Sequence, residues 1–262
     1  MLPTIPNQEY LLRKERLQNM MQQNGLDLLI TYSDDRFTYG QAYARWICNY
    51  IPQFESCLLM IPAHGDIVLA TGAESEEYAL TFAKNVLVRV ADIFLHPDEE
   101  YPYTTVTPFA KVVREVEDML GKEIKNIGVG GDEMIPHRLY AALLESFPGA
   151  KFVNAEPELM KLRAIKTPAE IQVIEYAYKI AQAGVKAAIE TIDVGRTERE
   201  VAAAAEFAMR SMGSEGSGIM TMVASGIRHL KPILATTSTR KIEKGDLVCM
   251  TIAPRYEGYH GA

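Results

Sequence analysis

Two histidines lie in segments where a side chain could exchange a proton with a substrate. His229 follows the polar stretch Ser225–Arg228, and His260 follows Arg255–Tyr259. Imidazole titrates near neutral pH, so either residue is a candidate general acid or base. His229 fits a polar loop residue equally well, and His260 also fits an exposed or internally hydrogen-bonded histidine. The sequence alone predicts no catalytic dyad for either residue.

Short motifs that carry common enzyme chemistry are absent. The chain has no Gly-x-Ser-x-Gly, no Walker phosphate-binding loop and no His-Glu-x-x-His. The segment Gly128–Gly131 has Glu133 where a dinucleotide-binding fingerprint needs its third glycine, so we interpret it as a strand-to-loop turn. Asp98–Glu100 is interpreted as a solvated loop. We therefore predict no cofactor and no metal ligands.

The cysteines and the N-terminus indicate the cellular compartment in which the protein is expected. Cys48, Cys57 and Cys249 are too few and too scattered for a disulfide framework or a zinc ribbon, which indicates a reducing cytoplasm. Cys57 and Cys249 stand in apolar runs and are predicted to be small core residues. The first residues lack a secretory signal, and no run of 18 apolar residues predicts a membrane span. We expect a cytoplasmic protein.

The net charge of the chain limits the kinds of molecule that we expect it to bind. The 262 residues carry a net charge of −7, which argues against nucleic acid and anionic membranes. Residues 1–160 hold 13 basic and 23 acidic residues, whereas residues 161–262 hold 14 and 11. A metal-dependent hydrolase usually concentrates carboxylates in its catalytic half, and the C-terminal part is short of them. Chance variation in surface charge would give the same pattern.

The first half alternates helical and strand patterns. Asn7 is the expected cap of the first helix, and Gly25 and Gly121 are the expected ends of two helices. The expected helices begin at about residues 7, 108 and 136, and the expected strands lie at 26–32, 56–61, 67–71, 127–129 and near Phe152. Such alternation predicts an α/β layer domain.

The second half begins with two strong helix starts. Thr167 with Glu170, and Thr197 with Glu200, form two capping boxes, each ahead of a helical pattern. Strand patterns follow at 219–224 and 247–252, and residues 255–261 are expected to return as an antiparallel strand. Two helices followed by paired strands are α+β in character. We place the domain boundary between residues 158 and 159.

Several segments of this second half resemble one family. Leu162–Ile171 and Ile180–Gly184 resemble the start of the pita-bread domain of creatinase, Xaa-Pro aminopeptidase and prolidase. Val223–Gly226 and Arg240–Val248 resemble later motifs of the same family. The resemblance implies a creatinase-type N-terminal α/β domain over 1–158. It also implies the first part of an α+β pita-bread-type catalytic domain over 159–262, a partial domain because the remaining motifs would lie beyond residue 262.

Metal-dependent members of this family carry two aspartates at positions that correspond to Thr251 and Ala262. Two neighbouring divalent ions need several hard oxygen ligands, which threonine and alanine do not supply. The pattern is closer to metal-free creatinase, which similarly has proline, glycine-tyrosine and alanine where this chain has Pro254, Gly258-Tyr259 and Ala262. Leu234, however, stands at or next to the position of the family's histidine base, and leucine cannot accept a proton.

The resemblance also implies substrate contacts and an assembly. Arg45 and Trp46 lie where creatinase-type N-terminal domains send residues towards a partner subunit's active site, so a homodimer is expected. Arg45 could hold a substrate carboxylate, although a surface arginine beside a buried tryptophan is the simpler interpretation.

The resulting hypothesis is a metal-independent hydrolase that acts on a C–N bond of a small or dipeptide-like substrate. His260 or His229 would supply the acid and base steps. A degenerate or truncated member, which keeps the fold as a dimerising or ligand-binding module, is the first alternative. An Xaa-Pro metallopeptidase is the second.

Overall fold

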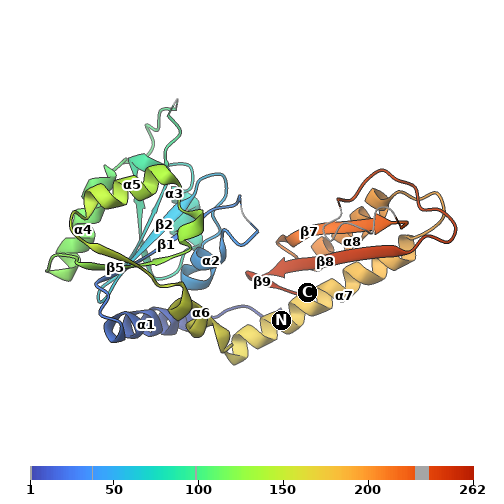
Figure 1. Cartoon of the computed structure of the whole chain (residues 1–262), viewed down its shortest axis with the longest axis horizontal. Helices are drawn as coiled ribbons and strands as arrows, with labels where there is room; N and C mark the ends of the chain where they lie inside the picture. Colours follow the sequence, from blue (N-terminus) through green and yellow to red (C-terminus); the bar gives the residue numbers. More distant parts are fainter. Residues whose placement is uncertain (1, 37, 98, 228–235) are drawn as a thin grey trace. The chain divides into compact units, whose positions relative to one another are not determined.

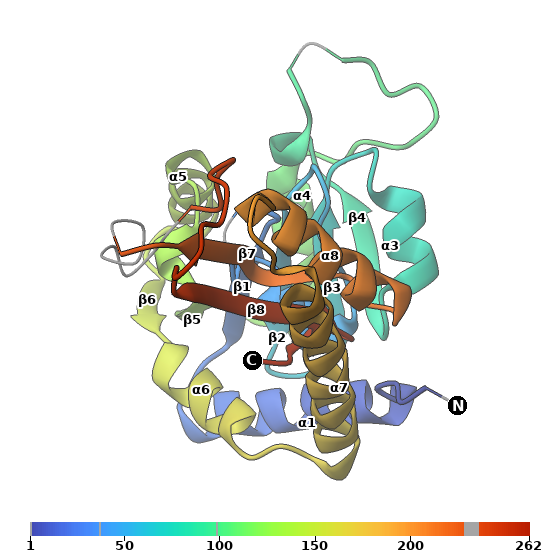
Figure 2. The same ribbon diagram turned by 90° about the vertical axis from the view of Figure 1, so that its right-hand side faces the viewer.

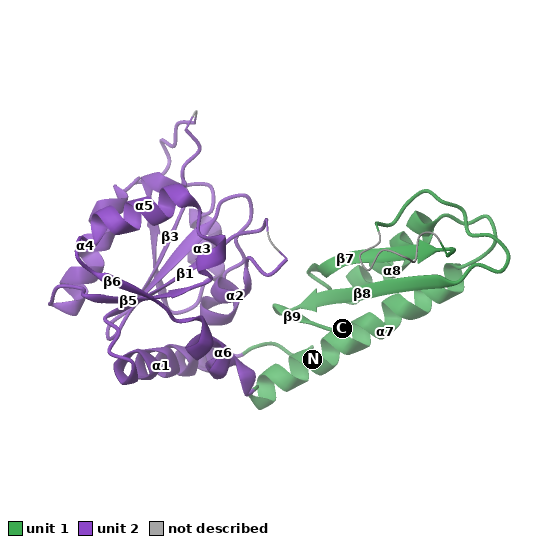
Figure 3. Ribbon diagram, in the orientation of Figure 1, with its two compact units in different colours: residues 1–5, 166–262 green, residues 6–165 purple. Residues whose placement is uncertain are grey.

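The computed structural model describes residues 2–36, 38–97, 99–227 and 236–262. They form two compact units (Figure 3). One unit spans Pro6–Ile165, and the other comprises residues 166–262 together with the first five residues of the chain. The division therefore falls seven residues after the expected boundary at 158–159, which remains a prediction. No helix in the described ranges combines the length and the apolar character that crossing a membrane requires.

The larger unit is built on a six-stranded sheet with strand order β4-β3-β2-β1-β5-β6. Its strands are β1 (Leu28–Ser33), β2 (Cys57–Pro62), β3 (Ile67–Thr71), β4 (Val86–Val90), β5 (Asn126–Gly130) and β6 (Lys151–Asn154). Only β2 runs antiparallel to its neighbours. All residues of β1, β2 and β3 are buried, as expected for a sheet covered on both faces.

Helices cover the faces of this six-stranded sheet (Figure 1). They are α1 (Asn7–Gln23), α2 (Ala42–Cys48), α3 (Glu76–Phe82), α4 (Phe109–Leu120), α5 (His137–Ser146) and α6 (Glu156–Ala164), with short 3₁₀ turns at Asp92–Phe94 and Asp132–Met134. The α4 helix is strongly amphipathic and buries Phe109, Val112, Val113 and Val116 in the core. This confirms the expected α/β domain.

Two details of the first half differ from the sequence expectations. Asn7 is the first helical residue of α1, and Pro6 occupies the cap position, so no side chain caps this helix. The β4 strand and the helices α2, α3 and α6 were not predicted. The turn interpretation of Gly128–Gly131 is confirmed, because β5 ends at Gly130 and Gly131 has a φ of 70°.

The smaller unit packs two helices on a three-stranded antiparallel sheet of order β7-β8-β9. Its elements are α7 (Pro168–Thr191), α8 (Glu198–Ser211), β7 (Gly216–Ser225), β8 (Val248–Tyr256) and β9 (Tyr259–His260). Figure 2 shows α7 and α8 side by side, and the two helices contact each other along their length. Both predicted capping boxes are present, with reciprocal hydrogen bonds at the start of α7 and of α8.

The predicted returning strand 255–261 is displaced in the structure. The β8 strand continues through Tyr256, and the chain turns at Glu257 and Gly258, which have φ angles of 50° and 78°. Only Tyr259 and His260 return as β9. Glycine at position 258 allows the chain to reverse there, later than residue 255, where the returning strand was predicted to begin.

The first residues of the chain are tied to this smaller unit. The Tyr256 hydroxyl donates a hydrogen bond of 2.9 Å to the carbonyl oxygen of Pro3. The amide of Ile5 donates to the carboxylate of Glu257 at 3.4 Å. The unit that holds α7 and α8 is therefore made of two separate pieces of chain.

Candidate functional site

The three-stranded sheet has two chemically different faces. Ile252 of β8 points towards the helices, because a Cβ added at Gly184 of α7 would lie 3.2 Å from its Cγ2 atom. Side chains alternate along a strand, so Thr251 and Arg255 point away from the helices. The register pairs Arg255 with His260 of β9, which puts both side chains on that second side. We call this side the Thr251 face; it carries Cys249, Thr251, Arg255 and His260.

His260 is held closely against the sheet. A Cβ added at Gly218 of β7 would lie 2.7 Å from three ring atoms of His260, so the imidazole occupies the space that a side chain at 218 would need. Burial, and then the charge of Arg255, lower the pKa of His260 below its ordinary 6.5. The ring is therefore mainly neutral at neutral pH and can accept a proton.

Cys249 lies on the same face and is exposed, so the prediction of a core position for it was wrong. The cause is strand alternation, because the apolar residues around Cys249 do not all face the helices. Cys57 is fully buried, as predicted, and burial raises the pKa of its thiol well above 9.

A buried polar cluster joins α8 to the end of β7 and to residues of the connection between β7 and β8. The carboxylate of Glu198, which is fully buried, accepts hydrogen bonds from the amide and hydroxyl of Ser225 and from the amide and hydroxyl of Ser238. Arg240 donates to the Ser225 hydroxyl at 2.6 Å and pairs with Asp246 at 2.5 Å. Sequence reasoning missed this cluster, since Glu198 follows the capping Thr197 directly and looks like an ordinary first-turn acid.

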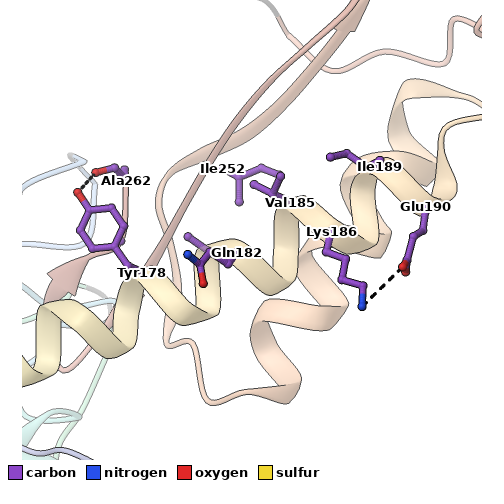
Figure 4. Close-up of a pocket in the computed structure, with 10 residues that line it drawn as sticks. Tyr178, Gln182, Val185, Lys186, Ile189, Glu190, Ile252 and Ala262 are labelled. Atoms are coloured by element: carbon purple, nitrogen blue, oxygen red, sulfur yellow. Dashed lines mark hydrogen bonds and ion pairs between the residues drawn. The ribbon is translucent and has the colours of Figure 1, made fainter.

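An apolar groove of about 550 Å³ runs along α7 beside the end of the sheet (Figure 4). Val185, Ile189 and Ile252 supply apolar surface, and the hydroxyl of Tyr178 donates to the carbonyl oxygen of Ala262. The charged pair in the groove, Lys186 and Glu190, is solvent-exposed at 3.8 Å. These residues offer apolar surface and an ordinary i,i+4 ion pair, so we do not place the chemistry there.

The predicted substrate contacts lie in the larger unit. Arg45 is buried on α2, and its guanidinium donates to the side chain and the carbonyl oxygen of Asn49. Trp46 is also buried; its carbonyl oxygen accepts from Arg13 at 2.7 Å, and the Arg13 guanidinium lies 5.2 Å from the centre of its ring. In this chain both residues make structural contacts, and their substrate role remains a prediction.

His229 and Leu234 lie outside the described residues. Of the two predicted histidines, the structure therefore places only His260. It pairs His260 with Arg255 across the ladder. Ala253 and Thr251 lie on the same side of the sheet as Arg255, two and four residues before it on β8. Arg255 was not among the predicted site residues.

Two family models match the chain. The Creatinase/Prolidase N-terminal domain matches residues 13–165, and Metallopeptidase family M24 matches residues 172–262. The chain belongs to the creatinase/prolidase family. This confirms the family that the sequence motifs indicated, and it confirms an α/β N-terminal domain followed by part of a pita-bread domain.

Two of the curated relatives are Xaa-Pro dipeptidases by name. The Xaa-Pro dipeptidase of Pyrococcus horikoshii is 31% identical over 183 residues, which cover 70% of this chain and 51% of the relative. The Xaa-Pro dipeptidase of Pyrococcus furiosus is 35% identical over 146 residues, covering 56% of this chain and 41% of the relative. The chain thus spans about half the length of the relatives it matches.

Solved structures show the same fold. An X-Pro aminopeptidase from Thermotoga maritima superposes with a TM-score of 0.76 at 24% identity, covering 94% of this chain and 62% of that one. The prolidase from Pyrococcus furiosus gives a TM-score of 0.72 at 24% identity, with coverages of 94% and 67%. At this identity the likeness concerns the fold alone.

The metal-dependent members of the family imply a pair of divalent ions, and the described residues can be tested for that role. Thr251 lies half-buried on β8 opposite Met222. Position 262 lies beyond the end of β9. The amide of Gly261 donates to the carbonyl oxygen of Pro254 at 3.1 Å, and Ala262 lines the groove along α7, where its carbonyl oxygen accepts from the Tyr178 hydroxyl.

These two positions supply a neutral hydroxyl and a methyl group. Within the ranges that the structure describes, no three His, Cys, Asp or Glu side chains gather as a metal site would require. Two dications side by side need several anionic oxygens. The described part of the Thr251 face therefore does not fit a metal pair.

Proposed function

We propose that the protein is a hydrolase that cleaves a C–N bond of a small, dipeptide-like substrate without using paired metal ions. The observation that carries the proposal is the chemistry of two positions, where Thr251 and Ala262 stand in place of the two aspartates that the metal-dependent members of the family carry. The names of the relatives support the reaction class and a dipeptide-like substrate.

In this proposal His260 is the proton acceptor. Its neutral ring would take a proton from the water that adds to the carbonyl or amidine carbon, and would return a proton to the leaving nitrogen. His229 is the second candidate for this role. We further propose that Arg45 and Trp46 contact the substrate from a partner subunit in a cytoplasmic homodimer, without nucleic acid or a membrane as partner.

A second candidate is an Xaa-Pro metallopeptidase. The match of residues 172–262 to Metallopeptidase family M24 favours it. In that case the ligands would have to be residues other than Thr251 and Ala262, because neither side chain can neutralise a dication.

Metal analysis of the full-length gene product distinguishes the two candidates. The protein is purified without added metal, and its Mn, Co, Fe and Zn contents are measured together with hydrolysis of Xaa-Pro dipeptides and creatine-like compounds. We expect less than one tenth of an equivalent of metal and a rate that a chelator does not change. A stoichiometric metal, or a rate that a chelator abolishes, would establish the metallopeptidase instead.

Replacement of His260 tests the catalytic residue. His260→Ala is compared with His64→Ala, which changes an exposed histidine in the loop between β2 and β3. We expect kcat to fall about 100-fold or more in the first variant and to stay unchanged in the second. Equal rates for wild type and His260→Ala would remove His260 from the mechanism, and no turnover of any compound by wild type would favour the non-catalytic module.

A further inference from the structure

The long helix α7 carries an apolar stripe on the side that does not pack on α8. Ile171, Tyr178, Val185 and Ile189 are 47%, 47%, 37% and 58% exposed. Seven residues are close to two helical turns, so these four side chains lie above one another along the helix. Large apolar side chains gathered on one exposed surface mark a place that another element covers.

The apolar groove of Figure 4 lies along this stripe. Tyr178, Val185 and Ile189 line it from α7, whereas Ile252 and Ala262 line it from the end of the sheet. We call this cavity of about 550 Å³ the α7 groove. It is therefore open between a helix and the sheet on which that helix packs.

The edge of β8 that faces β9 is paired over only part of its length. The β8 strand has nine residues and β9 has two, which pair with Arg255 and Tyr256. The bond from the amide of Gly261 to Pro254 adds one more contact. Within the described ranges, no strand lies beside residues 248–253 on this edge. An open edge presents backbone N–H and C=O groups that can pair with a further strand.

The last residues of the chain lie at both features. Gly261 is bonded to β8, and Ala262 lines the α7 groove, where Tyr178 holds its carbonyl oxygen. The chain spans about half the length of the curated relatives that it matches. A segment that continues from Ala262 would therefore begin beside the open edge of β8 and at the α7 groove.

We propose that the α7 groove and the open edge of β8 form one docking surface, covered by an extended segment that follows Ala262 in the full-length gene product. The backbone of this segment bonds to β8, and its apolar side chains fill the groove. Because side chains alternate along a strand, its remaining side chains lie on the Thr251 face. The inference goes beyond the proposed function, since it holds whichever reaction is catalysed there, and it adds that the candidate site is completed by this segment.

A thiol placed in the groove tests the proposal in the full-length gene product. Cys249→Ser first removes the exposed native thiol. Ile189→Cys is then compared with Leu80→Cys, because the two positions are 58% and 59% exposed and Leu80 lies on α3 of the other unit. We expect a maleimide to label position 189 at least about tenfold more slowly than position 80, and both equally in urea. Equal labelling rates without urea would overturn the proposal.

Photo-crosslinking identifies what covers the groove. Gln182, an exposed residue that lines it, is replaced by p-benzoylphenylalanine, and the crosslinked peptides are identified by mass spectrometry. We expect crosslinks within one chain to peptides that follow Ala262. Crosslinks between two copies, or protection of position 189 only at concentrations where a dimer forms, would assign the groove to a second copy and contradict the proposal. Neither measurement involves turnover, so a failure of the proposed function leaves both results interpretable.

Discussion

Glu198 and Ser238 are joined by two hydrogen bonds to one carboxylate oxygen, from the serine amide at 2.9 Å and from its hydroxyl at 2.6 Å. Ser225 makes the equivalent pair, at 2.7 and 2.8 Å, to the other oxygen. One buried charge therefore holds the last residue of β7 and a residue of the connection between β7 and β8. All four donors are satisfied by the ionised form, which makes the carboxylate a structural element of the site.

Replacing Glu198 by glutamine should destabilise the protein. The amide group of glutamine cannot accept the two hydrogen bonds that one carboxylate oxygen receives, so buried donors would lose their partner. We expect a loss of about 1–3 kcal/mol in the free energy of unfolding, measured by urea denaturation. Glu206→Gln, at an exposed position of the same helix, is the control. A Glu198→Gln protein as stable as the control would show that the cluster contributes nothing.

The same carboxylate should make stability depend on pH. Burial alone raises the pKa of Glu198, but the hydrogen bonds from Ser238 and Ser225 outweigh it, and the pKa lies below its ordinary 4.5. A lowered pKa in the folded state stabilises the protein fully above pH 4.5, and this contribution is lost as the pH falls below that value. Denaturation between pH 3 and 6 should therefore show a steeper acid loss in wild type than in Glu198→Gln. If the stability of the two proteins fell in parallel with pH, the lowered pKa of Glu198 would be contradicted.

His260 should titrate below its ordinary value. Burial and Arg255 both disfavour the imidazolium form, so NMR of ring-labelled histidines should give a pKa below 6.5. Arg255→Gln removes the second cause and should move the pKa part of the way back, because burial remains. By linkage, the neutral ring stabilises the fold above pH 6.5 and less as the pH falls. A pKa at or above 6.5 in wild type would contradict the placement of the ring.

Two glycine replacements against α7 should differ in cost. A Cβ at Gly261 would lie 2.1 Å from the carbonyl oxygen of Ala177, a backbone atom that cannot move aside. A Cβ at Gly184 would meet Cγ of Met209 at 2.7 Å, which belongs to a flexible side chain. We expect Gly261→Ala to cost about 1–3 kcal/mol in unfolding free energy. Gly184→Ala should be less harmful, since alanine gains roughly 1 kcal/mol of helix propensity. The reverse order would show that Gly261 does not pack against the backbone of α7.

Local features of the fold were predictable from the sequence, and distant ones were not. The capping boxes at Thr167 and Thr197 involve residues three positions apart, so the sequence displays them directly. The helices α2 and α3 have seven residues each, too short for a clear periodicity, and packing in the sheet domain stabilises them.

The same limit applies to predicting the candidate site from the sequence. The absence of carboxylates at Thr251 and Ala262 could be inferred through the family motifs, because those motifs fix the positions. The approach of His260 to Gly218 could not, since it depends on the register of β7 against β8 and of β8 against β9. The partners of Glu198 lie 27 and 40 positions away, and only the folded chain brings them together.

The anchoring of Pro3 by the Tyr256 hydroxyl has a practical consequence for how this protein is handled. Cleaving the link between Ile165 and Lys166 would not free the smaller unit from the rest, because its opening residues belong covalently to the other fragment. A tag fused ahead of Leu2 would likewise end within two residues of Pro3, whose carbonyl oxygen Tyr256 holds. Dissecting the protein into separately expressed halves therefore requires carrying the first five residues along with the second half.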